Sequence, residues 1–265
     1  MPIAQQIGEA TIDRLAYVGE LVRLMAGACR AVFVDPFRGR RIRYGRAVHQ
    51  AMAVGVQAIP VVSLISFFVG LILALQAAYE LRRLGALHLV AGTVALSMTR
   101  ELGPLMTAVV VIGRSGSAFA AEIGTMKVNE EIDALETMAL EPVHFLVAPK
   151  LVAMLLMMPC LTTWSDLTGI VGGGVFGVMS AGFSWHSYFR ATIDAMVRRD
   201  IFIGLAKSII FAVVITAVGC QEGFTTGLGS EQVGKSTTAA VVKSIFLVVV
   251  MDLVFTSVFY ITAPK

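Results

Sequence analysis

Five long apolar segments constrain this chain more than any other feature of its sequence. The hydrocarbon core of a bilayer is about 30 Å thick, so a helix needs roughly 20 mostly apolar residues to cross it. Charged residues make up 15% of the 265 residues, whereas soluble domains usually contain about 25%. The sequence therefore predicts an all-α polytopic membrane protein with about five transmembrane helices, and the apolar segments lie at about 49–79, 87–121, 146–182, 201–220 and 238–262.

Two of these segments leave the number of crossings open. The first is long and contains Pro60, so we expect it to be kinked or partly re-entrant. The third contains Pro159, Asp166 and a glycine-rich run from Gly169 to Gly177, whose small residues let helices approach closely. Counted as one crossing, the third segment gives five spans; counted as two, it would invert the topology of everything that follows.

Residues 1–48 form a different kind of segment. Charged residues interrupt it too often for a membrane span, but apolar residues recur at nearly helical intervals at Ile7, Leu15, Val18, Val22, Met25 and Val32. This pattern predicts an amphipathic helix that lies in the membrane interface and ends at Asp35-Pro36. Eight arginines precede the first span, so the positive-inside rule predicts a cytoplasmic N-terminus. The transmembrane domain is expected over 49–265.

One motif suggests nucleotide binding, and we reject it. The segment G-S-E-Q-V-G-K-S, from Gly229 to Ser236, matches the phosphate-binding P-loop pattern, and Asp252 ends an apolar run 16 residues later. A P-loop must lie between a buried strand and a helix of an α/β domain. Here the flanking apolar runs have the length of membrane spans, and only 29 residues follow Ser236. We predict a polar cytoplasmic loop that leads into the last span.

The sequence also lacks the residue patterns typical of metal-binding, catalytic and nucleic-acid-binding sites. The three cysteines are far apart and lack metal-ligand or disulfide spacing. The four histidines are scattered, without Glu-x-x-His pairs or a Gly-x-Ser-x-Gly motif. No basic patch interleaved with aromatic residues favours nucleic acid. We therefore expect no catalytic residue, no metal site and no nucleic-acid partner for this chain.

Four ionisable residues lie in apolar surroundings, and these are Arg100, Glu101, Lys207 and Asp252. A charge at the centre of a membrane helix costs roughly 2.5–3.5 kcal/mol on insertion scales, so such residues usually face a bundle interior or a wet cavity. Two interpretations are open. Pairs such as Glu101–Lys207 or Arg100–Asp252 could join helices, or these residues could line a polar passage and contact a lipid headgroup. The Gly103-Pro104 pair is expected to weaken or kink its helix.

Arg114 and Glu122 belong to a different environment. They are eight residues apart, which is about two helical turns, so they share one face of a helix. They approach the end of the second span, where a long arginine can reach the interface. Small residues separate them, and these permit tight helix packing. We predict a structural role for both charges.

The segment 128–142 is a candidate for a short cytoplasmic helix. Asn129 is the expected N-cap, and acidic residues favour the first turn of the helix: Glu130, Glu131 and Asp133. One face is apolar and consists of Ile132, Leu135 and Met138 with Ala139. In the cytoplasm this face has no lipid to cover it, so we expect it to dock in a groove of a partner. The alternative is a helix lying on the membrane, which the acidic first turn disfavours.

Three blocks resemble the MlaE (YrbE) family of ABC transporter permeases. They are Arg100 to Met126, Asn129 to Pro142 (N-E-E-I-D-A-L-E-T-M-A-L-E-P) and Gly234 to Thr256. The resemblance implies a homodimeric inner-membrane permease that moves phospholipid or a related lipid between the inner membrane and a periplasmic MCE-domain protein. It also implies a separate cytoplasmic ATPase that binds ATP, so that this chain holds no cofactor, and often a small STAS-domain partner.

The same resemblance implies roles for particular residues. It makes 128–142 the coupling helix that transmits the motion of the ATPase, and it supports a cavity role for Glu101 and Lys207. The alternative from another class is an ion-coupled secondary transporter of an amphipathic substrate, with Glu101 and Asp252 as proton carriers. Inverted repeats often mark that class, and the sequence shows none by eye.

Overall fold

The computed structural model describes residues 3–34, 44–180 and 182–262, and within these ranges every regular element is a helix. Five helical segments are long and apolar enough to cross a membrane, which confirms the all-α polytopic prediction and the count of five. In chain order they are Gly45–Arg83, Leu87–Val128, Val143–Met179, Arg198–Phe224 and Ser230–Ile261. The third segment is one crossing, because the long helix α8 (Ala148–Ser180) continues through Pro159.

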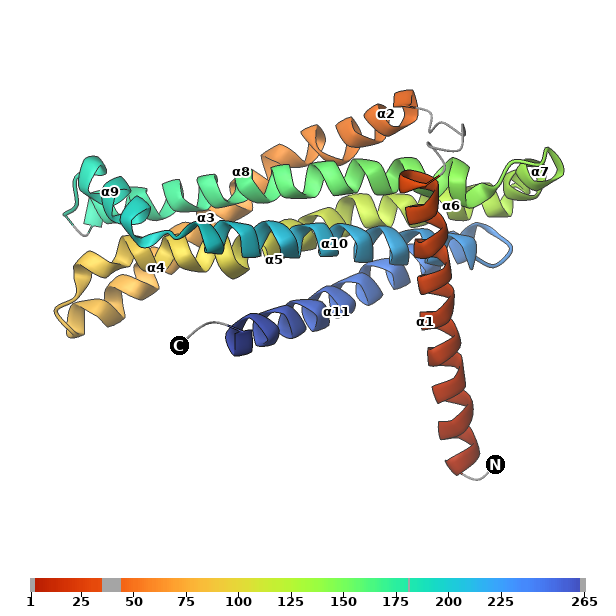
Figure 1. Ribbon diagram of the computed structural model, residues 1–265, viewed down its shortest axis with the longest axis horizontal. Helices are drawn as coiled ribbons and strands as arrows, with labels where there is room; N and C mark the ends of the chain where they lie inside the picture. Colours follow the sequence, from red (N-terminus) through yellow and green to blue (C-terminus); the bar gives the residue numbers. More distant parts are fainter. Residues whose placement is uncertain (1–2, 35–43, 181, 263–265) are drawn as a thin grey trace.

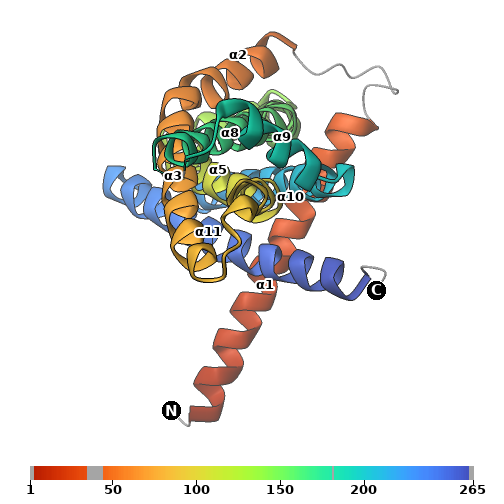
Figure 2. The same ribbon diagram turned by 90° about the vertical axis from the view of Figure 1, so that its left-hand side faces the viewer.

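The spans run side by side between two ends of the bundle (Figure 1). The short helix α7 (Glu131–Thr137) lies at one end and α9 (Trp185–Ala195) at the other, and we call these the α7 end and the α9 end. Helix α1 (Ile3–Phe33) crosses the bundle axis at the α7 end instead of running along it (Figures 1 and 2). This orientation is the one expected of an interfacial helix.

The first span is broken before its proline, not at it. Helix α2 (Tyr44–Val54) is followed by a 3-10 turn, Val56–Ala58, and then by α3 (Ile59–Arg83). Pro60 therefore lies in the first turn of α3, where a missing N–H leaves no helical hydrogen bond unmade. Together α2 and α3 run from the α7 end to the α9 end (Figure 1), so the first segment is kinked and is not re-entrant.

The second span changes its helical pitch twice. It consists of α4 (Val90–Ser97), a π-helical turn at Met98–Leu102, α5 (Gly103–Val111), a second π-helical turn at Ile112–Gly116, and α6 (Ser117–Val128). The first π turn has a cause in the sequence. Pro104 has no N–H to donate to Arg100, four residues earlier, and its ring would clash with that carbonyl. The Gly103 N–H instead bonds the carbonyl of Met98, five residues earlier.

Helices α3 and α8 pack closely because glycines meet at their contact. A Cβ atom added to Gly70 would lie 1.9 Å from the carbonyl oxygen of Gly169, and one added to Gly172 would lie 2.1 Å from that of Phe67. Close backbone approach through small residues is the usual basis of helix association in membranes. Next to this contact, the buried hydroxyls of Ser66 and Ser165 are hydrogen-bonded at 2.6 Å.

The glycine run of α8 also makes room for one large side chain. The ring of Tyr188, on α9, is fully buried against Gly173, Gly174 and Gly177. Its hydroxyl donates a hydrogen bond of 3.2 Å to the Ile170 carbonyl, and burial raises the pKa of Tyr188 to about 12. The glycines therefore serve two contacts, one with α3 and one with the cap that α9 forms over the bundle.

The last two spans are α10 (Arg198–Phe224) and α11 (Ser230–Thr262), joined by a short turn at the α7 end. Gly229 ends this turn with φ +102°, and the residues up to Ser236 already belong to α11. The P-loop-like segment thus forms the first turns of a membrane helix, and no strand precedes it in the described part of the chain.

Replacement of Gly70 by alanine tests the α3–α8 contact. The new Cβ would overlap the Gly169 carbonyl, and overpacking of this kind typically costs about 1–3 kcal/mol. We expect the variant to unfold at a lower temperature, measured by circular dichroism in detergent. Gly113→Ala is the matched control, since no atom outside its own helix lies within 4 Å of its Cβ position. Equal midpoints for the two variants would contradict this account.

Candidate functional site

The most unusual side chain in the bundle is the ammonium of Lys207. It lies on α10, its side chain is fully buried, and apolar residues surround it in the sequence. Its Nζ contacts Glu101 Oε2 on the second span, and it lies 2.8 Å from Asp252 Oδ1 on α11. The Thr256 hydroxyl, one turn further along α11, accepts a hydrogen bond of 2.8 Å from the same Nζ. Three spans therefore converge on one lysine.

The π turn brings Glu101 to this position. Gly204 of α10 packs against the turn so closely that an added Cβ would lie 2.1 Å from the carbonyl oxygen of Thr99. Lys207 follows Gly204 by about one turn of α10, so its side chain reaches the carboxylate of Glu101. The Thr256 hydroxyl completes the contact by donating to Glu101 Oε1 at 3.0 Å. We call Glu101, Lys207, Asp252 and Thr256 the lysine cluster.

The lysine cluster is open on one side. Asp252 is 16% exposed, but Glu101 is 39% exposed, and Thr256 is exposed as well. The cluster contains two carboxylates and one ammonium, so it has one negative charge in excess when all three groups are ionised. A partly exposed carboxylate in a membrane span is not expected to face acyl chains. This side of the single chain therefore needs water, a polar ligand or another protein surface.

Arg100 does not join this cluster, and the suggested ion pair between Arg100 and Asp252 is not formed. Its Nε instead donates a hydrogen bond of 2.7 Å to Asp200 Oδ1. Asp200 lies in the first turn of α10, where its other oxygen accepts the Val197 N–H at 3.1 Å. Consecutive residues of a helix point in different directions, so Arg100 reaches the beginning of α10 while Glu101 reaches its interior. The expected Glu101–Lys207 pair is present.

Arg114 and Glu122 each contact another span and not each other. Arg114 donates to the Ala53 carbonyl at 2.7 Å and to the Gln57 side chain. Glu122 forms an ion pair with Lys150 of α8, whose side chain is only 2% exposed. Both contacts join separate helices of the bundle. The structural role of the two charges stays a prediction.

The segment predicted to couple to a partner differs from the expectation in two ways. Asn129 is the C-cap of α6 and not an N-cap. The N-cap of α7 is Glu130, whose φ is 59°. The predicted helix over 128–142 is shorter and spans only Glu131–Thr137. More important, Ile132 and Leu135 are 4% and 7% exposed. Half of the apolar face expected to dock on a partner is therefore buried within this chain, whereas Met138 and Ala139 are exposed.

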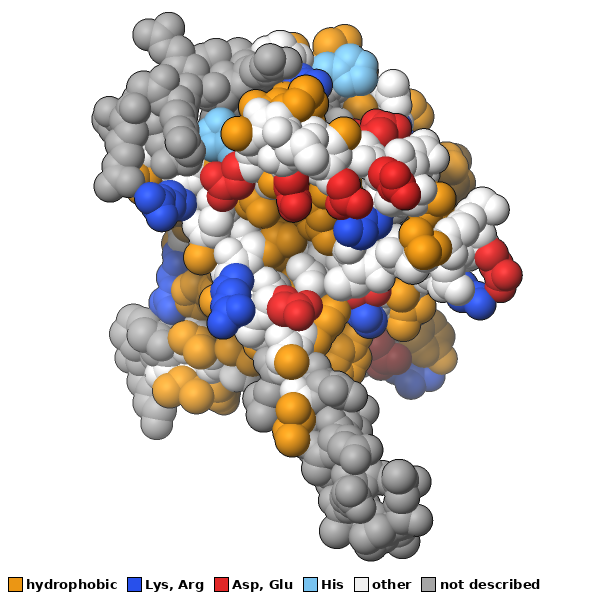
Figure 3. All heavy atoms as spheres, turned by 90° about the vertical axis from the view of Figure 1, so that its right-hand side faces the viewer, with side chains coloured by type: hydrophobic (Ala, Val, Ile, Leu, Met, Phe, Trp, Pro, Cys, Tyr) orange, Lys and Arg blue, Asp and Glu red, His pale blue; other side chains and the backbone are white. Residues whose placement is uncertain are grey.

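The exposed face of the α7 segment is acidic instead. Figure 3 views the α7 end directly and shows acidic side chains gathered there. The exposed acidic residues of the segment are Glu130, Glu131, Asp133, Glu136 and Glu141. Met138 lies among them with 62% of its surface exposed. A partner at this end would meet negative charge around the exposed apolar side chains of Met138 and Leu140.

Comparison with known proteins places these features in a family. The family model Permease MlaE matches residues 47–258. The chain belongs to the MlaE permease family. A "Probable ABC transporter permease protein" of Rickettsia bellii is 34% identical over 258 residues, which cover 97% of this chain and 98% of the relative. A protein of the same description from Synechocystis is 38% identical over 221 residues, which cover 83% and 84% of the two chains.

A plant protein is also similar. "Protein TRIGALACTOSYLDIACYLGLYCEROL 1, chloroplastic" of Arabidopsis thaliana is 34% identical over 220 residues, which cover 83% of this chain and 63% of the relative. The match to the MlaE family covers the lysine cluster and the α7 segment, but all of α1 lies outside it. As an MlaE-family permease, the chain is a multi-pass membrane subunit of an ABC transporter, a class that works with an ATPase partner.

Several charged or polar residues of this MlaE-family chain were not found from the sequence. They are Lys150, Asp200, Glu222 and Thr256. Lys150 and Asp200 lie at the edges of apolar segments, where charges normally belong to loops. Asp200 could have been identified as an acidic residue in the first turn of a helix. Thr256 offers no signal, because threonine is common in membrane helices.

Removal of the central ammonium tests how strongly the lysine cluster holds the bundle. Lys207→Met would leave two carboxylates without their cation, and breaking a buried pair in this way costs about 3–5 kcal/mol. We expect a large loss of thermal stability in detergent. Lys127→Met removes a partly exposed lysine from a looser pair with Asp133, and should cost less than about 1 kcal/mol. If the two variants lose the same stability, the cluster does not join the spans.

Proposed function

We propose that this chain is the permease subunit of an ABC transporter that moves phospholipids between the inner membrane and a periplasmic MCE-domain protein. A separate cytoplasmic ATPase drives the movement, and ATP binds to that subunit. One observation carries the proposal: a carboxylate, Glu101, is partly exposed on the side of a membrane bundle, beside a buried ammonium. Such a position suits the headgroup of an amphipathic molecule whose tails remain in apolar surroundings.

The chemistry of the lysine cluster agrees with a lipid headgroup. Its exposed edge offers the carboxylate of Glu101 and the hydroxyl of Thr256, with the Lys207 ammonium directly behind them. The cationic group of a zwitterionic headgroup can bond to the partly exposed carboxylate of Glu101, which carries the excess negative charge of the cluster. The name of the Arabidopsis relative is that of a galactolipid, which supports a lipid as the class of substrate.

In this proposal, a second copy of the chain covers the open side of the lysine cluster. Helix α11 is exposed over most of its length, including Val250, Leu253 and Val254. Two copies that face each other across α11 would enclose both lysine clusters in one cavity. A homodimer therefore solves the problem of a carboxylate exposed within the bilayer.

The α7 end is the cytoplasmic end in this arrangement. Arg46, Lys127 and Lys235 lie near that end of the spans, and α1 with its arginines lies there too, in agreement with the positive-inside rule. The acidic α7 segment then faces the ATPase, with Met138 as its apolar anchor, and a small STAS-domain subunit could complete the complex. The ion-coupled alternative loses support, because the relatives are ABC permeases.

Glu101→Gln tests the cargo role. The variant keeps the shape and a hydrogen bond but removes the charge, and a charge-assisted hydrogen bond contributes about 1.5–3 kcal/mol. We expect phospholipid transfer to fall roughly tenfold or more in liposomes that contain the chain, its ATPase and the MCE-domain protein. Glu80→Gln, at an exposed position of α3 outside the lysine cluster and the α7 segment, should transfer lipid normally. Unchanged transfer by Glu101→Gln, with the complex intact, would remove the lysine cluster from the lipid path.

Met138→Asp together with Glu131→Lys tests the coupling role of the α7 segment. Both side chains are exposed, so the fold should persist, whereas a change at the buried Leu135 would not separate coupling from folding. We expect loss of the ATPase on co-purification, or loss of lipid-stimulated ATP hydrolysis. Glu80→Lys, an exposed charge reversal near the α9 end, is the control. Full assembly and stimulation in the α7 variant would refute the coupling role.

A further inference from the structure

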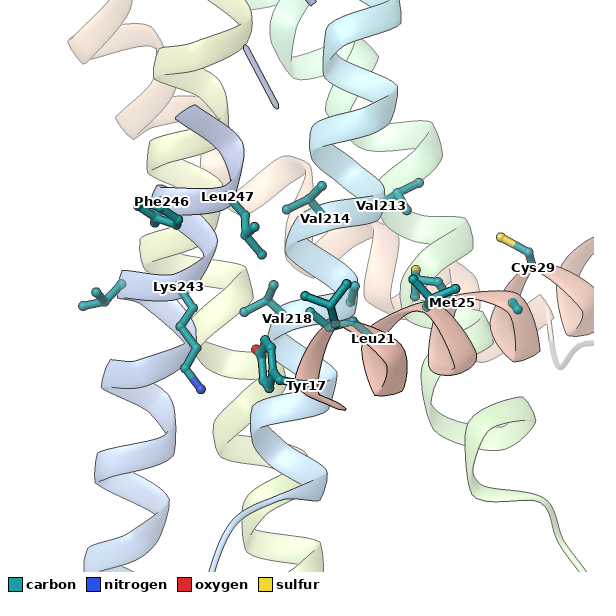
Figure 4. A pocket seen from close by; sticks show the side chains of 15 residues that line it. Tyr17, Leu21, Met25, Cys29, Val213, Val214, Val218, Lys243, Phe246 and Leu247 are labelled. Carbon is teal, nitrogen blue, oxygen red and sulfur yellow. The ribbon is translucent and has the colours of Figure 1, made fainter. Parts of the chain in front are cut away.

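A long apolar groove lies closer to the α7 end than the lysine cluster does, where α1 crosses the last two spans. Its volume is about 1090 Å³, slightly above the 300–1,000 Å³ of ordinary ligand pockets. Figure 4 shows α1 along one side of the groove, with α10 and α11 forming the walls. The groove is lined mainly by large apolar side chains, among them Leu21, Met25, Val214, Val218, Phe246 and Leu247.

A polar hollow adjoins the groove on α11. It has a volume of about 670 Å³ and lies along the first turns of the helix, between Glu231 and Lys243. Lys235 and Thr238 contribute an ammonium and a hydroxyl to its wall. Val242 and Lys243 line both the groove and the hollow. The two spaces therefore adjoin at Lys243, and the hollow adds the charged side chains of Glu231 and Lys235 to its lining.

Lys243 is held in place by a buried carboxylate. Its Nζ donates a hydrogen bond of 2.7 Å to Glu222 Oε1, and Glu222 is only 7% exposed. The ammonium lies 4.4 Å from the centre of the Tyr17 ring, and the Tyr17 hydroxyl donates to the same carboxylate oxygen at 2.7 Å. Burial, and then Glu222, raises the pKa of Tyr17 above its ordinary value, so this hydroxyl remains a donor. The site is built from three helices.

The lysines of this site retain free donors. Lysine has three N–H donors, and Lys243 remains 45% exposed after its bond to Glu222. Lys235 is 63% exposed and has one carboxylate partner, Glu231, at 2.8 Å. Two ammonium groups with free N–H donors can bind a phosphate, whereas the Thr238 hydroxyl already donates to the Gly234 carbonyl at 3.1 Å.

The depth of the site matches a lipid. Helix α1 lies across the bundle axis at the α7 end, as an interfacial helix does (Figure 1). In Figure 4, Val214 and Leu247 lie beside α1, on the parts of α10 and α11 that lead into the bundle. With α1 in the membrane interface, these residues are at the depth of acyl chains. The hollow on the first turns of α11 lies towards the α7 end, at the level of headgroups. The order from apolar to polar is that of a lipid in the leaflet at this end.

A second protein helix fits the groove less well. Helices associate in membranes through small residues that allow close backbone approach, as Gly70 and Gly169 do between α3 and α8. The groove is lined instead by branched and aromatic side chains, and Ala26 and Ala217 are its only small residues apart from Cys29. Flexible acyl chains can fill such an irregular surface without a close backbone contact.

We propose that this groove and hollow bind one glycerophospholipid of the leaflet at the α7 end. Its acyl chains lie between α1, α10 and α11, and its phosphate contacts Lys243 and Lys235. The site is separate from the lysine cluster and is not the proposed cargo path. The bound lipid would join α1 to the last two spans.

Photolabelling tests the site on the full chain in nanodiscs of phosphatidylcholine. A small fraction of a phospholipid with a diazirine in one acyl chain is added, and labelled residues are identified by mass spectrometry after irradiation. We expect several-fold more labelling at Val22 and Val214, inside the groove, than at Ile12 and Ile209. These two residues are exposed on the same helices but do not line the groove.

Two variants locate the ligand within the site. Val22→Trp fills the groove at an exposed position and should abolish labelling of Val214, whereas Ile12→Trp on the same helix should not. Lys243→Gln should lower groove labelling roughly tenfold, by loss of a charge-assisted hydrogen bond to phosphate, and Lys127→Gln should leave it unchanged.

Three outcomes would overturn the proposal. Equal labelling inside and outside the groove would show contact with bulk lipid only. Groove labelling that persists in Val22→Trp would place the lipid elsewhere. A cross-link between two copies through groove residues would show that a second chain occupies the groove. The experiment needs no ATPase, MCE-domain protein or transport, so its result is independent of the proposed transport function.

Discussion

The buried ammonium of Lys207 is the interaction on which the arrangement of the spans depends. An isolated charge inside a bilayer is too costly to persist, so Lys207 requires Glu101 and Asp252 beside it. These two carboxylates belong to the second and fifth spans, and the lysine belongs to the fourth. Any arrangement that separates the three spans leaves at least one charge unpaired in an apolar environment. Apolar packing alone discriminates weakly between such arrangements, because lipid tails are as apolar as the helices.

Local backbone chemistry makes this convergence possible. Pro104 prevents a regular helical bond to Arg100, and the π turn that results places Arg100 and Glu101 on different partners. Gly204 then allows α10 to approach the turn closely enough for Lys207 to reach Glu101. The same device recurs between α3 and α8, where Gly70 and Gly169 meet. Glycine and proline, which weaken helices in water, here determine where the helices touch.

The sequence predicted the features that depend on composition or on the spacing of apolar residues. These are the five spans, the amphipathic first helix and the unusual charges within the spans. It did not predict features that depend on a distant neighbour. Arg100 pairs with Asp200 because α10 begins beside the π turn, and no pattern near Arg100 indicates that. Ile132 and Leu135, expected to face a partner, are covered by this chain itself, and Met138 lies beyond the end of α7 and is exposed. The kink of the first span precedes Pro60, because proline fits well in the first turn of α3.

Two ion pairs join α10 and α11 at different heights along the bundle, and the helix that supplies the cation differs between them. Near the α9 end the cation belongs to α10, as Lys207, and the anion to α11, as Asp252. Near the α7 end the anion belongs to α10, as Glu222, and the cation to α11, as Lys243. Lys207 and Glu222 are 15 residues apart, or about 22 Å along a helix. A parallel arrangement, or a large slide of α11 along α10, would bring like charges together or leave them unpaired. The two pairs thus specify both the antiparallel direction and the register of these helices, which fixes the lysine cluster relative to the α7 end.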